Sequence, residues 1–181
     1  MEKRDCLLLK MLGLKTMLSE SQNIETYKML GQVAMCAGGS EFKISWAMSL
    51  LEQGLETENL AILATLLKPV NEFEADDYFN RVLAELSITR PSDEAAIEGY
   101  VKVITDEVTK GYLLPESAVS KICAANVRLD YPGFLGEFTT LEDEWYCECI
   151  NGWSKQKRNE EIIKACKEAY EALNYPYIRE A

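Results

Sequence analysis

Histidine is absent from this 181-residue chain, and its absence limits the chemistry that the chain can perform. Histidine is the side chain that most often moves protons near neutral pH, and it is the commonest metal ligand. A nucleophilic Cys or Ser would need a lysine or a carboxylate as its activating base instead, and the sequence marks no such group. We therefore expect a protein that is not an enzyme, with no catalytic residue, no metal site and no cofactor.

Long hydrophobic runs are also lacking. The most apolar stretch, Leu60–Leu67, is far shorter than the roughly 20 residues that a membrane-spanning helix needs. The N-terminus carries mixed charges, and Lys10 and Lys15 interrupt the leucines that follow, which indicates an amphipathic helix and not a signal peptide. The cysteines are scattered among apolar residues, as reduced, buried thiols are. We therefore expect a cytoplasmic protein.

Proline is scarce, and no repetitive or Ser/Gly-rich segment separates two halves of the chain. At this length, a chain that is 48% hydrophobic can bury enough surface for one core. We expect a single helical domain over residues 1–181. A seam is expected near residues 87–91, where the helical pattern is interrupted.

Positive charge is the next deficit. The formal net charge is −11 at pH 7, and a smoothly negative surface repels nucleic-acid phosphates and membrane headgroups. The basic residues between 155 and 167 are interleaved with glutamates, which is typical of a solvated helix face. We expect the partner to be another protein, a basic one, and neither nucleic acid nor a membrane. The sequence leaves the oligomeric state open.

Apolar residues recur at helical spacing along the chain, and no strand-length run alternates between apolar and polar residues. The predicted fold class is all-α, a compact array of about eight or nine helices in antiparallel hairpins around a single core. Helix starts are predicted at the capping residues Ser40, Asn71, Ser92 and Thr140. Helix ends are predicted at Gly54, Gly111, Asn126 and Gly152.

Two of these helices carry specific burial predictions. Residues 58–67 are apolar on nearly every side, which predicts a short helix buried at the centre of the fold. Asn71 followed by Glu74 resembles a capping box that opens the next helix. The buried stripe predicted for that helix comprises Phe73, Ala75, Phe79, Val82, Leu83 and Leu86.

The densest acidic stretch contains no Lys or Arg between Phe134 and Asn151. Its acids are Glu137, Glu142, Asp143, Glu144 and Glu148. Carboxylates at this spacing can bind a hard cation or act as a paired acid and base, but such runs are more often solvated faces. A second acidic group, Glu72, Glu74, Asp76 and Asp77, lacks the alternating ligands and central glycine of a calcium loop.

Large aromatic residues crowd beside the first of these acidic stretches, at Tyr131, Phe134, Phe138, Trp145, Tyr146 and Trp153. Aromatic anchors ringed by negative charge are typical of a protein-binding hot spot that faces a basic partner. Aromatic residues also dominate cores, so packing of a loop onto the helices is the alternative interpretation.

Several segments resemble a widespread group of small, all-helical bacterial proteins without an assigned activity. In the first half they are ISWAMSLLEQG (residues 44–54), LAILATL (60–66), FEADDYF (73–79) and LAEL (83–86). In the second half they are PESAV (115–119), LDYP (129–132) and LEDEW (141–145). The resemblance covers roughly residues 40–173. It implies a bacterial, helical protein that is not an enzyme, and it carries over no catalytic residue.

These observations lead to one main hypothesis and two alternatives. The main hypothesis is a protein-binding module, an acidic inhibitor of the immunity type that masks a basic toxin or nuclease. The predicted partner-binding residues are Glu137, Glu142, Asp143, Glu144, Glu148, Trp145, Trp153, Glu72 and Asp76. The first alternative is a helical adaptor or scaffold that holds its partner in an apolar groove. The second is an enzyme or metal protein that uses carboxylates.

Overall fold

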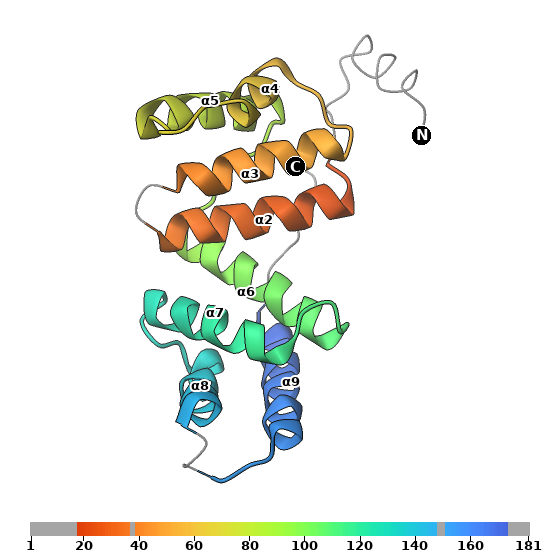
Figure 1. The fold of residues 1–181 in the computed structure, drawn as a ribbon, viewed down its shortest axis with the longest axis vertical. Helices are drawn as coiled ribbons and strands as arrows, with labels where there is room; N and C mark the ends of the chain where they lie inside the picture. Colours follow the sequence, from red (N-terminus) through yellow and green to blue (C-terminus); the bar gives the residue numbers. More distant parts are fainter. Residues whose placement is uncertain (1–17, 37–38, 148–150, 174–181) are drawn as a thin grey trace. The chain divides into compact units, whose positions relative to one another are not determined.

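The structure, a computed structural model, describes residues 18–36, 39–147 and 151–173 (Figure 1). These ranges contain eight α-helices, one 3-10 helix and no strand, so the all-α prediction is confirmed. The helices are α2 (Glu20–Met35), α3 (Ser40–Glu52), α4 (Glu58–Ala64), α5 (Glu72–Glu85), α6 (Asp93–Thr109), α7 (Pro115–Arg128), the 3-10 helix η1 (Gly133–Leu135), α8 (Glu137–Cys147) and α9 (Lys155–Ala172). The amphipathic helix expected near the N-terminus falls in residues 1–17, outside these ranges.

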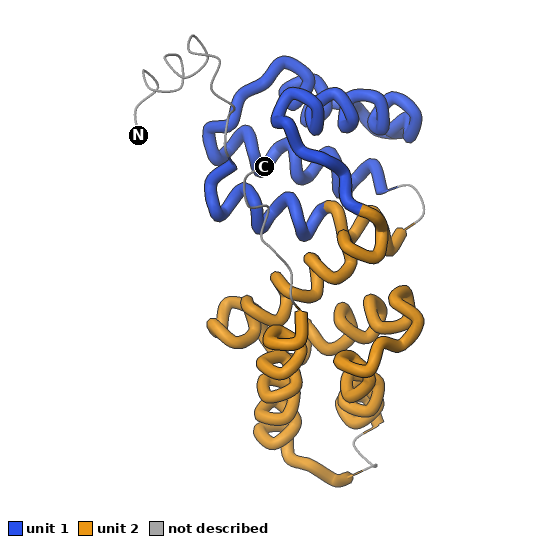
Figure 2. Tube along the Cα trace, turned by 180° about the vertical axis from the view of Figure 1, so that it is seen from behind, with its two compact units in different colours: residues 1–29, 38–91 blue, residues 30–37, 92–181 orange. Residues whose placement is uncertain are grey.

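The chain divides into two compact units (Figure 2). Unit 1 comprises residues 1–29 and 38–91, and unit 2 comprises residues 30–37 and 92–181. The border after Pro91 falls at the end of the predicted seam. The border also crosses α2, whose first ten residues belong to unit 1 and whose last six belong to unit 2. That the chain folds as a single domain stays a prediction.

In unit 1, the helices α3, α4 and α5 pack on one another through their apolar stripes. The rings of Trp46 and Phe79 are buried and meet edge-on, with 5.6 Å between their centroids. The indole N–H of Trp46 donates a hydrogen bond of 3.0 Å to the hydroxyl of Thr26. The one polar atom of this buried indole therefore has a partner, and burial of the ring carries no unsatisfied donor.

In unit 2, α6 packs against α7 and α9, and α8 packs against the same two helices. One cluster of buried side chains fills the space between them, and Ile104, Ile122, Phe138 and Ile162 represent the four helices in it. Because α6 and α9 are distant in sequence, this cluster depends on contacts that the local helical signals do not specify.

Lys102 on α6 binds the C-terminal end of α9. Its ammonium donates hydrogen bonds to the backbone carbonyls of Tyr170 and Leu173, the latter at 2.8 Å, and lies 3.6 Å from the centroid of the Tyr170 ring. The last carbonyls of a helix have no partner within the helix, and the dipole favours a cation there. Burial lowers the pKa of Lys102 from its usual value.

Several capping predictions are confirmed. The Ser92 hydroxyl accepts a hydrogen bond from the backbone N–H of Ala95 at 3.2 Å, at the start of α6. The Asn71 side chain accepts one from the backbone N–H of Phe73 at 3.1 Å, at the start of α5, but Glu74 does not make the return bond of the predicted capping box. Gly54 follows the C-cap of α3 with a φ of 81°, a conformation that costs glycine nothing.

Two predicted helix starts are wrong. Ser40 is the first residue of α3 and is buried, and the N-cap is Gly39, whose φ is 82°. Thr140 lies inside α8, which already begins at Glu137. In both cases a capping side chain near a helix start is displaced from the cap position, because the backbone enters the helix earlier than the local sequence signal predicts.

The predicted end of α7 is also wrong. Asn126 lies inside the helix and is fully buried, and its amide N–H donates to the hydroxyl of Thr139 at 3.2 Å. The left-handed residues follow later, at Asp130 (φ 58°) and Tyr131 (φ 57°). The backbone N–H of Tyr131 closes the turn by donating to the carbonyl of Asn126 at 2.9 Å.

α4 is shorter than predicted and is not buried on every side. Leu60 and Leu63 are fully buried, but the helix ends at Ala64. Leu67, which the prediction placed in the same buried helix, lies in the connection to α5 and is 86% exposed. An apolar composition therefore indicates burial only for the residues that face α3 and α5.

Gly31 of α2 tests the packing within unit 2. A Cβ at Gly31 would lie 2.2 Å from the Cβ of Tyr100 on α6, so the two backbones approach too closely for any side chain. We expect Gly31→Ala to destabilise the protein by about 1–3 kcal/mol through overpacking, although alanine normally favours a helix. Chemical unfolding followed by circular dichroism measures this, with Gly133→Ala as the control because open space surrounds Gly133. Equal effects of the two substitutions would contradict the close approach.

Candidate functional site

The structure separates the acids of the α8 stretch into different environments. Glu137 and Asp143 are exposed, Glu142 is half-buried, and Glu144 is fully buried. Glu148 lies outside the described residues. Of the described acids in this stretch, Glu144 is therefore not one of the outward carboxylates that the hypothesis assigns to partner binding.

Glu144 has a structural role. Its carboxylate accepts hydrogen bonds from the backbone N–H of Asn151 at 2.9 Å, from the Asn151 side-chain amide at 3.3 Å and from the backbone N–H of Trp153 at 3.3 Å. These bonds hold the segment that leads into α9. Because the side chain has no exposed surface, the prediction that Glu144 contacts a partner is corrected.

The two tryptophans predicted as anchors also face inward. Trp145 and Trp153 are half-buried and pack against the core cluster of unit 2. The Arg158 guanidinium and the Lys155 ammonium lie 5.3 Å and 5.7 Å from the centroid of the Trp145 ring, and the Lys157 ammonium lies 6.0 Å from that of Trp153. Stacked cations stabilise such rings where they are, so packing explains them better than partner binding does.

The α7–α8 contact contains a buried thiol. Burial raises the pKa of Cys123 to about 11, and the Glu142 carboxylate adds to this effect. Cys166 on α9 has its pKa raised to about 12 by burial alone. Both thiols stay protonated and unreactive at neutral pH, which argues against a nucleophilic role. Cys36 and Cys147 are exposed.

α5 presents the most exposed large apolar side chain in the described ranges. Phe73, predicted to be buried, is 87% exposed, whereas the other stripe residues of the helix are buried. The reason is rotational, because successive residues of a helix turn by about 100°. Phe73 lies roughly 140° from the centre of the stripe formed by Ala75, Phe79, Val82 and Leu83. A helical-wheel projection of the sequence would have placed it on the outer face.

Three acids of α5 are held by neighbouring side chains. Asp76 pairs with the buried ammonium of Lys43, Asp77 accepts from Arg81 at 2.6 Å, and Glu85 accepts from the side chains of Thr57 and Asn59. Asp76 therefore serves the interior of unit 1, where Lys43 is 2% exposed and also lies 5.7 Å from the Phe79 ring centroid. Its role as a partner contact loses support.

Two acids of α5 remain without such a contact. Glu72 and Glu74 flank Phe73, are exposed, and have no hydrogen bond or ion pair with another described residue. The nearest lysine in sequence, Lys68, is already paired with Glu41 at 2.6 Å, and that hydrogen bond lowers the pKa of Glu41. The carboxylates of Glu72 and Glu74 are therefore available to an external cation.

We call Leu67, Glu72, Phe73 and Glu74 the α5 corner. It combines two apolar side chains, each more than four-fifths exposed, with two carboxylates that have no partner in the described part of the chain, all within eight residues. Of its members, only Glu72 was among the predicted partner-binding residues. Leu67 and Phe73 were assigned to the core from composition, so the apolar half of the corner was missed.

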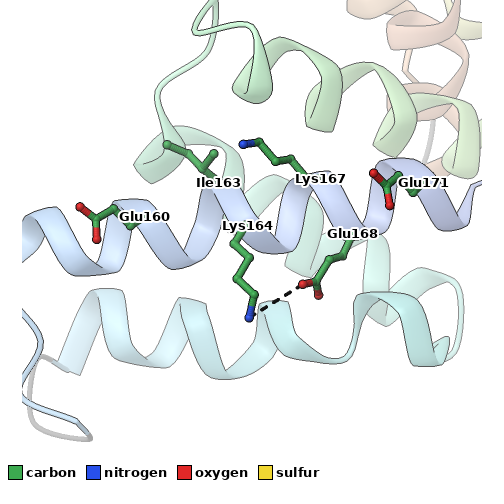
Figure 3. A pocket seen from close by; sticks show the side chains of 6 residues that line it. All are labelled: Glu160, Ile163, Lys164, Lys167, Glu168 and Glu171. Carbon is green, nitrogen blue, oxygen red and sulfur yellow. Dashed lines mark ion pairs between the residues drawn. The ribbon is translucent and has the colours of Figure 1, made fainter.

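A hollow of about 420 Å³ lies over α9 (Figure 3). Its lining residues are Glu160, Ile163, Lys164, Lys167, Glu168 and Glu171. All of them come from one helix, and all but Ile163 are charged. Small-molecule sites are usually enclosed by several elements and lined by apolar side chains, so this hollow does not resemble one.

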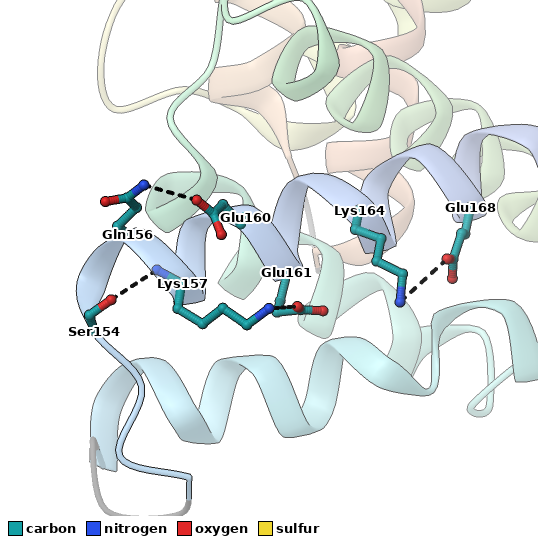
Figure 4. A network of polar contacts seen from close by, with 7 residues as sticks. All are labelled: Ser154, Gln156, Lys157, Glu160, Glu161, Lys164 and Glu168. Carbon is teal, nitrogen blue, oxygen red and sulfur yellow. Dashed lines mark hydrogen bonds and ion pairs between the residues drawn. The ribbon is translucent and has the colours of Figure 1, made fainter.

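Neighbouring charges on α9 neutralise one another (Figure 4). Lys157 pairs with Glu161, and Lys164 lies 3.8 Å from Glu168. Gln156 donates to Glu160 at 3.0 Å, one turn further along the helix. The lysines of α9 are exposed, as predicted for a solvated helix face, whereas Arg158 is 7% exposed and belongs to the interior.

Comparison with known proteins identifies no matching family model, no matching curated protein and no matching solved structure. The resemblance to the uncharacterised bacterial group therefore stays a prediction. Among the described residues, no group of three or more Cys, Asp or Glu is arranged to hold a metal ion. None of the helices in those ranges is long and apolar enough to cross a membrane.

The role assigned to Glu144 can be tested by stability. We expect Glu144→Ala to destabilise the protein by about 1–3 kcal/mol, because the backbone N–H groups of Asn151 and Trp153 lose the carboxylate that accepts from them. Asp143→Ala, on the same helix but exposed, should change stability by less than about 0.5 kcal/mol. Urea unfolding measures both. A neutral Glu144→Ala would show that the carboxylate does not hold this segment.

Buried ionisable groups predict a loss of stability in alkali. The pKa values of Cys123, Cys166 and Tyr100 are raised to about 11, 12 and 12 in the folded chain, chiefly by burial. The unfolded chain releases these protons at lower pH, from about pH 9 upward for the thiols. The free energy of unfolding should therefore be independent of these groups below pH 8 and fall above pH 9, by up to about 1.4 kcal/mol per pH unit for each group.

Denaturant titrations at pH 8, 9, 10 and 10.5 measure this slope. Cys166→Ala should make the slope shallower, whatever its effect at pH 8, because one of the three groups is gone. Cys36→Ala is the matched control, since Cys36 is exposed. An unchanged slope in Cys166→Ala would contradict the assignment.

Proposed function

We propose that this protein is a non-enzymatic protein-binding module, an acidic inhibitor of the immunity type that masks a basic surface on a toxin or nuclease. The α5 corner is its contact surface. The observation that carries the proposal is the exposed ring of Phe73 between the unpaired carboxylates of Glu72 and Glu74. Aromatic anchors supply affinity in protein interfaces, and opposite charge speeds the encounter.

The distribution of charge supports a basic partner. The net charge of −11 steers cations toward the protein from a distance, and salt weakens this attraction. Contact then requires carboxylates that are not already paired within the chain. The α5 corner has them. Around α8, Glu144 is buried and Trp145 and Trp153 pack against the core of unit 2, so Glu137, Glu142 and Asp143 have no exposed tryptophan beside them. The exposed Tyr146 of that helix shares a hydrogen bond of 3.0 Å with Ser120.

The scaffold alternative needs an apolar groove. The hollow over α9 is lined by residues of that single helix, so it is not a groove between helices that would hold a partner. The carboxylate-enzyme alternative gains no support from Cys123 and Cys166, whose raised pKa values make them poor nucleophiles.

The proposal is tested by charge reversal at two places. We expect Glu72→Lys together with Glu74→Lys to weaken partner binding by about tenfold or more and to reduce its salt dependence. Glu137→Lys together with Asp143→Lys makes the same change in net charge on α8 and should have a smaller effect. Affinity capture from the native lysate at low and high salt, with mass spectrometry, identifies the partner, and titration of the purified partner gives the affinities.

Circular dichroism controls for folding, because lysines in the first turn of a helix oppose its dipole. Unchanged binding by the α5 pair would remove the α5 corner from consideration. A neutral or acidic partner that persists at high salt would replace the inhibitor function with that of a scaffold.

A further inference from the structure

We infer that Phe73 is a convex anchor, whose partner presents an apolar socket bordered by lysine or arginine side chains. This inference rests on the proposed function and adds the chemistry of the partner's surface. Its first support is geometric. A ring that is 87% exposed on the outer face of a helix cannot form the floor of a groove, so the concave member of the pair must be the partner.

The second support is that the backbone of Phe73 is already fixed. Phe73 lies in the first turn of α5, and its N–H is bound to the Asn71 side chain at 3.1 Å. Ala75 and Phe79 of the same helix are fully buried in unit 1. An anchor on such a support loses little conformational freedom on binding, which is how preorganised contacts gain affinity.

The third support concerns the border of the socket. Burial of the Phe73 ring brings the partner close to Glu72 and Glu74, which have no cation of their own in the part of the chain that the structure describes. A purely apolar partner would desolvate both carboxylates without compensation, which is unfavourable. Lysine or arginine side chains around the socket would pair with them.

The same reasoning argues against a second copy of this chain as the occupant. A symmetric contact at this place would bring two α5 corners together, and four unpaired carboxylates would face one another. Self-association through Phe73 is therefore an outcome that would overturn the inference.

The experiment places the photoreactive residue benzoylphenylalanine at position 73 of the full chain. A matched variant carries it at position 112, because Tyr112 in unit 2 is 80% exposed and lies outside the α5 corner. Both variants are irradiated in the native lysate, and the cross-linked peptides are sequenced by mass spectrometry. We expect position 73 to cross-link to an apolar residue of a basic protein, with lysine or arginine nearby in that protein's sequence or structure, and in much higher yield than position 112.

Two further variants test the parts of the corner separately, with the purified cross-linked protein as the titrant. Phe73→Ala should weaken binding on the order of 30-fold, and Phe73→Leu should retain most of it, because the socket recognises apolar volume. Glu72→Gln together with Glu74→Gln should weaken binding about five- to tenfold at low salt and have little effect at high salt.

The outcomes separate this inference from the proposed function. Cross-linking from position 112 and not from 73 would leave a protein-binding module but overturn the anchor. Cross-linking to a second copy of this chain, or to a site without basic residues, would overturn the socket chemistry. An affinity that is insensitive to Phe73→Ala would do the same. No cross-link from either position, together with no partner in affinity capture, would overturn both.

Discussion

Burial of one apolar stripe on each helix is the interaction on which both units depend. A short helix is marginal by itself in water, and packing of its apolar face supplies most of its stability. α4 shows this clearly, because its seven residues persist through the buried Leu60 and Leu63 and a hydrogen bond of 3.3 Å from the backbone N–H of Leu60 to the Thr57 hydroxyl. The faces that remain outside are then free to vary in charge, and the acidic character of the protein is a property of those faces.

Three charged side chains in or beside the interior are each bonded to another segment of the chain. Lys43, Lys102 and Glu144 each carry a charge that is out of water or close to the core, and each is held by an ion pair or hydrogen bonds from a different segment. Removal of one partner from such a contact costs more than the contact contributes, because the other partner remains desolvated. Lys43 therefore fixes the contact between α3 and α5, Lys102 fixes the C-terminal end of α9, and Glu144 fixes the segment that leads into α9. Each does so more specifically than apolar packing alone.

The local parts of the fold were predictable from the sequence. Ser92 and Asn71 act as caps, Gly54 takes the left-handed conformation, and the all-α class follows from the periodicity. The errors occur where tertiary contact competes with a local signal. Asparagine is a common residue at helix ends, yet the amide of Asn126 donates to Thr139 across the α7–α8 contact, and the helix continues past it.

The candidate site was harder to predict, because two acidic segments of similar composition have different surroundings. In and after α8 the sequence marks an acid, Glu144, and two tryptophans, Trp145 and Trp153, that pack inside unit 2. The cations over their rings come from the first turn of α9. On α5 the deciding facts are the pairing of Asp76 with Lys43, 33 residues away, and the absence of a similar pairing of Glu72 and Glu74 with any described residue. Amino-acid composition shows neither fact.

The orientation of Phe73, in contrast, could have been predicted from the sequence, because rotation of about 100° per residue places it opposite the buried stripe. It was missed because an apolar residue near a stripe was counted as part of it.

If the protein has the function proposed above, the two carboxylates beside Phe73, which have no partner among the described residues, matter more than the total charge for the specificity of binding. Exposed charges separated by more than about 8–10 Å are largely screened at physiological salt, so most of the net charge of −11 affects how often a basic protein approaches and not which surface it contacts. Selection among basic proteins must come from groups that are desolvated on contact. At the α5 corner these are an aromatic ring and two carboxylates, and each sets a separate requirement on the partner: apolar volume for the ring and cations for its border. Under that proposal, a basic protein that meets only one requirement would either desolvate charge without compensation or bury little apolar surface, and it would bind more weakly than one that meets both.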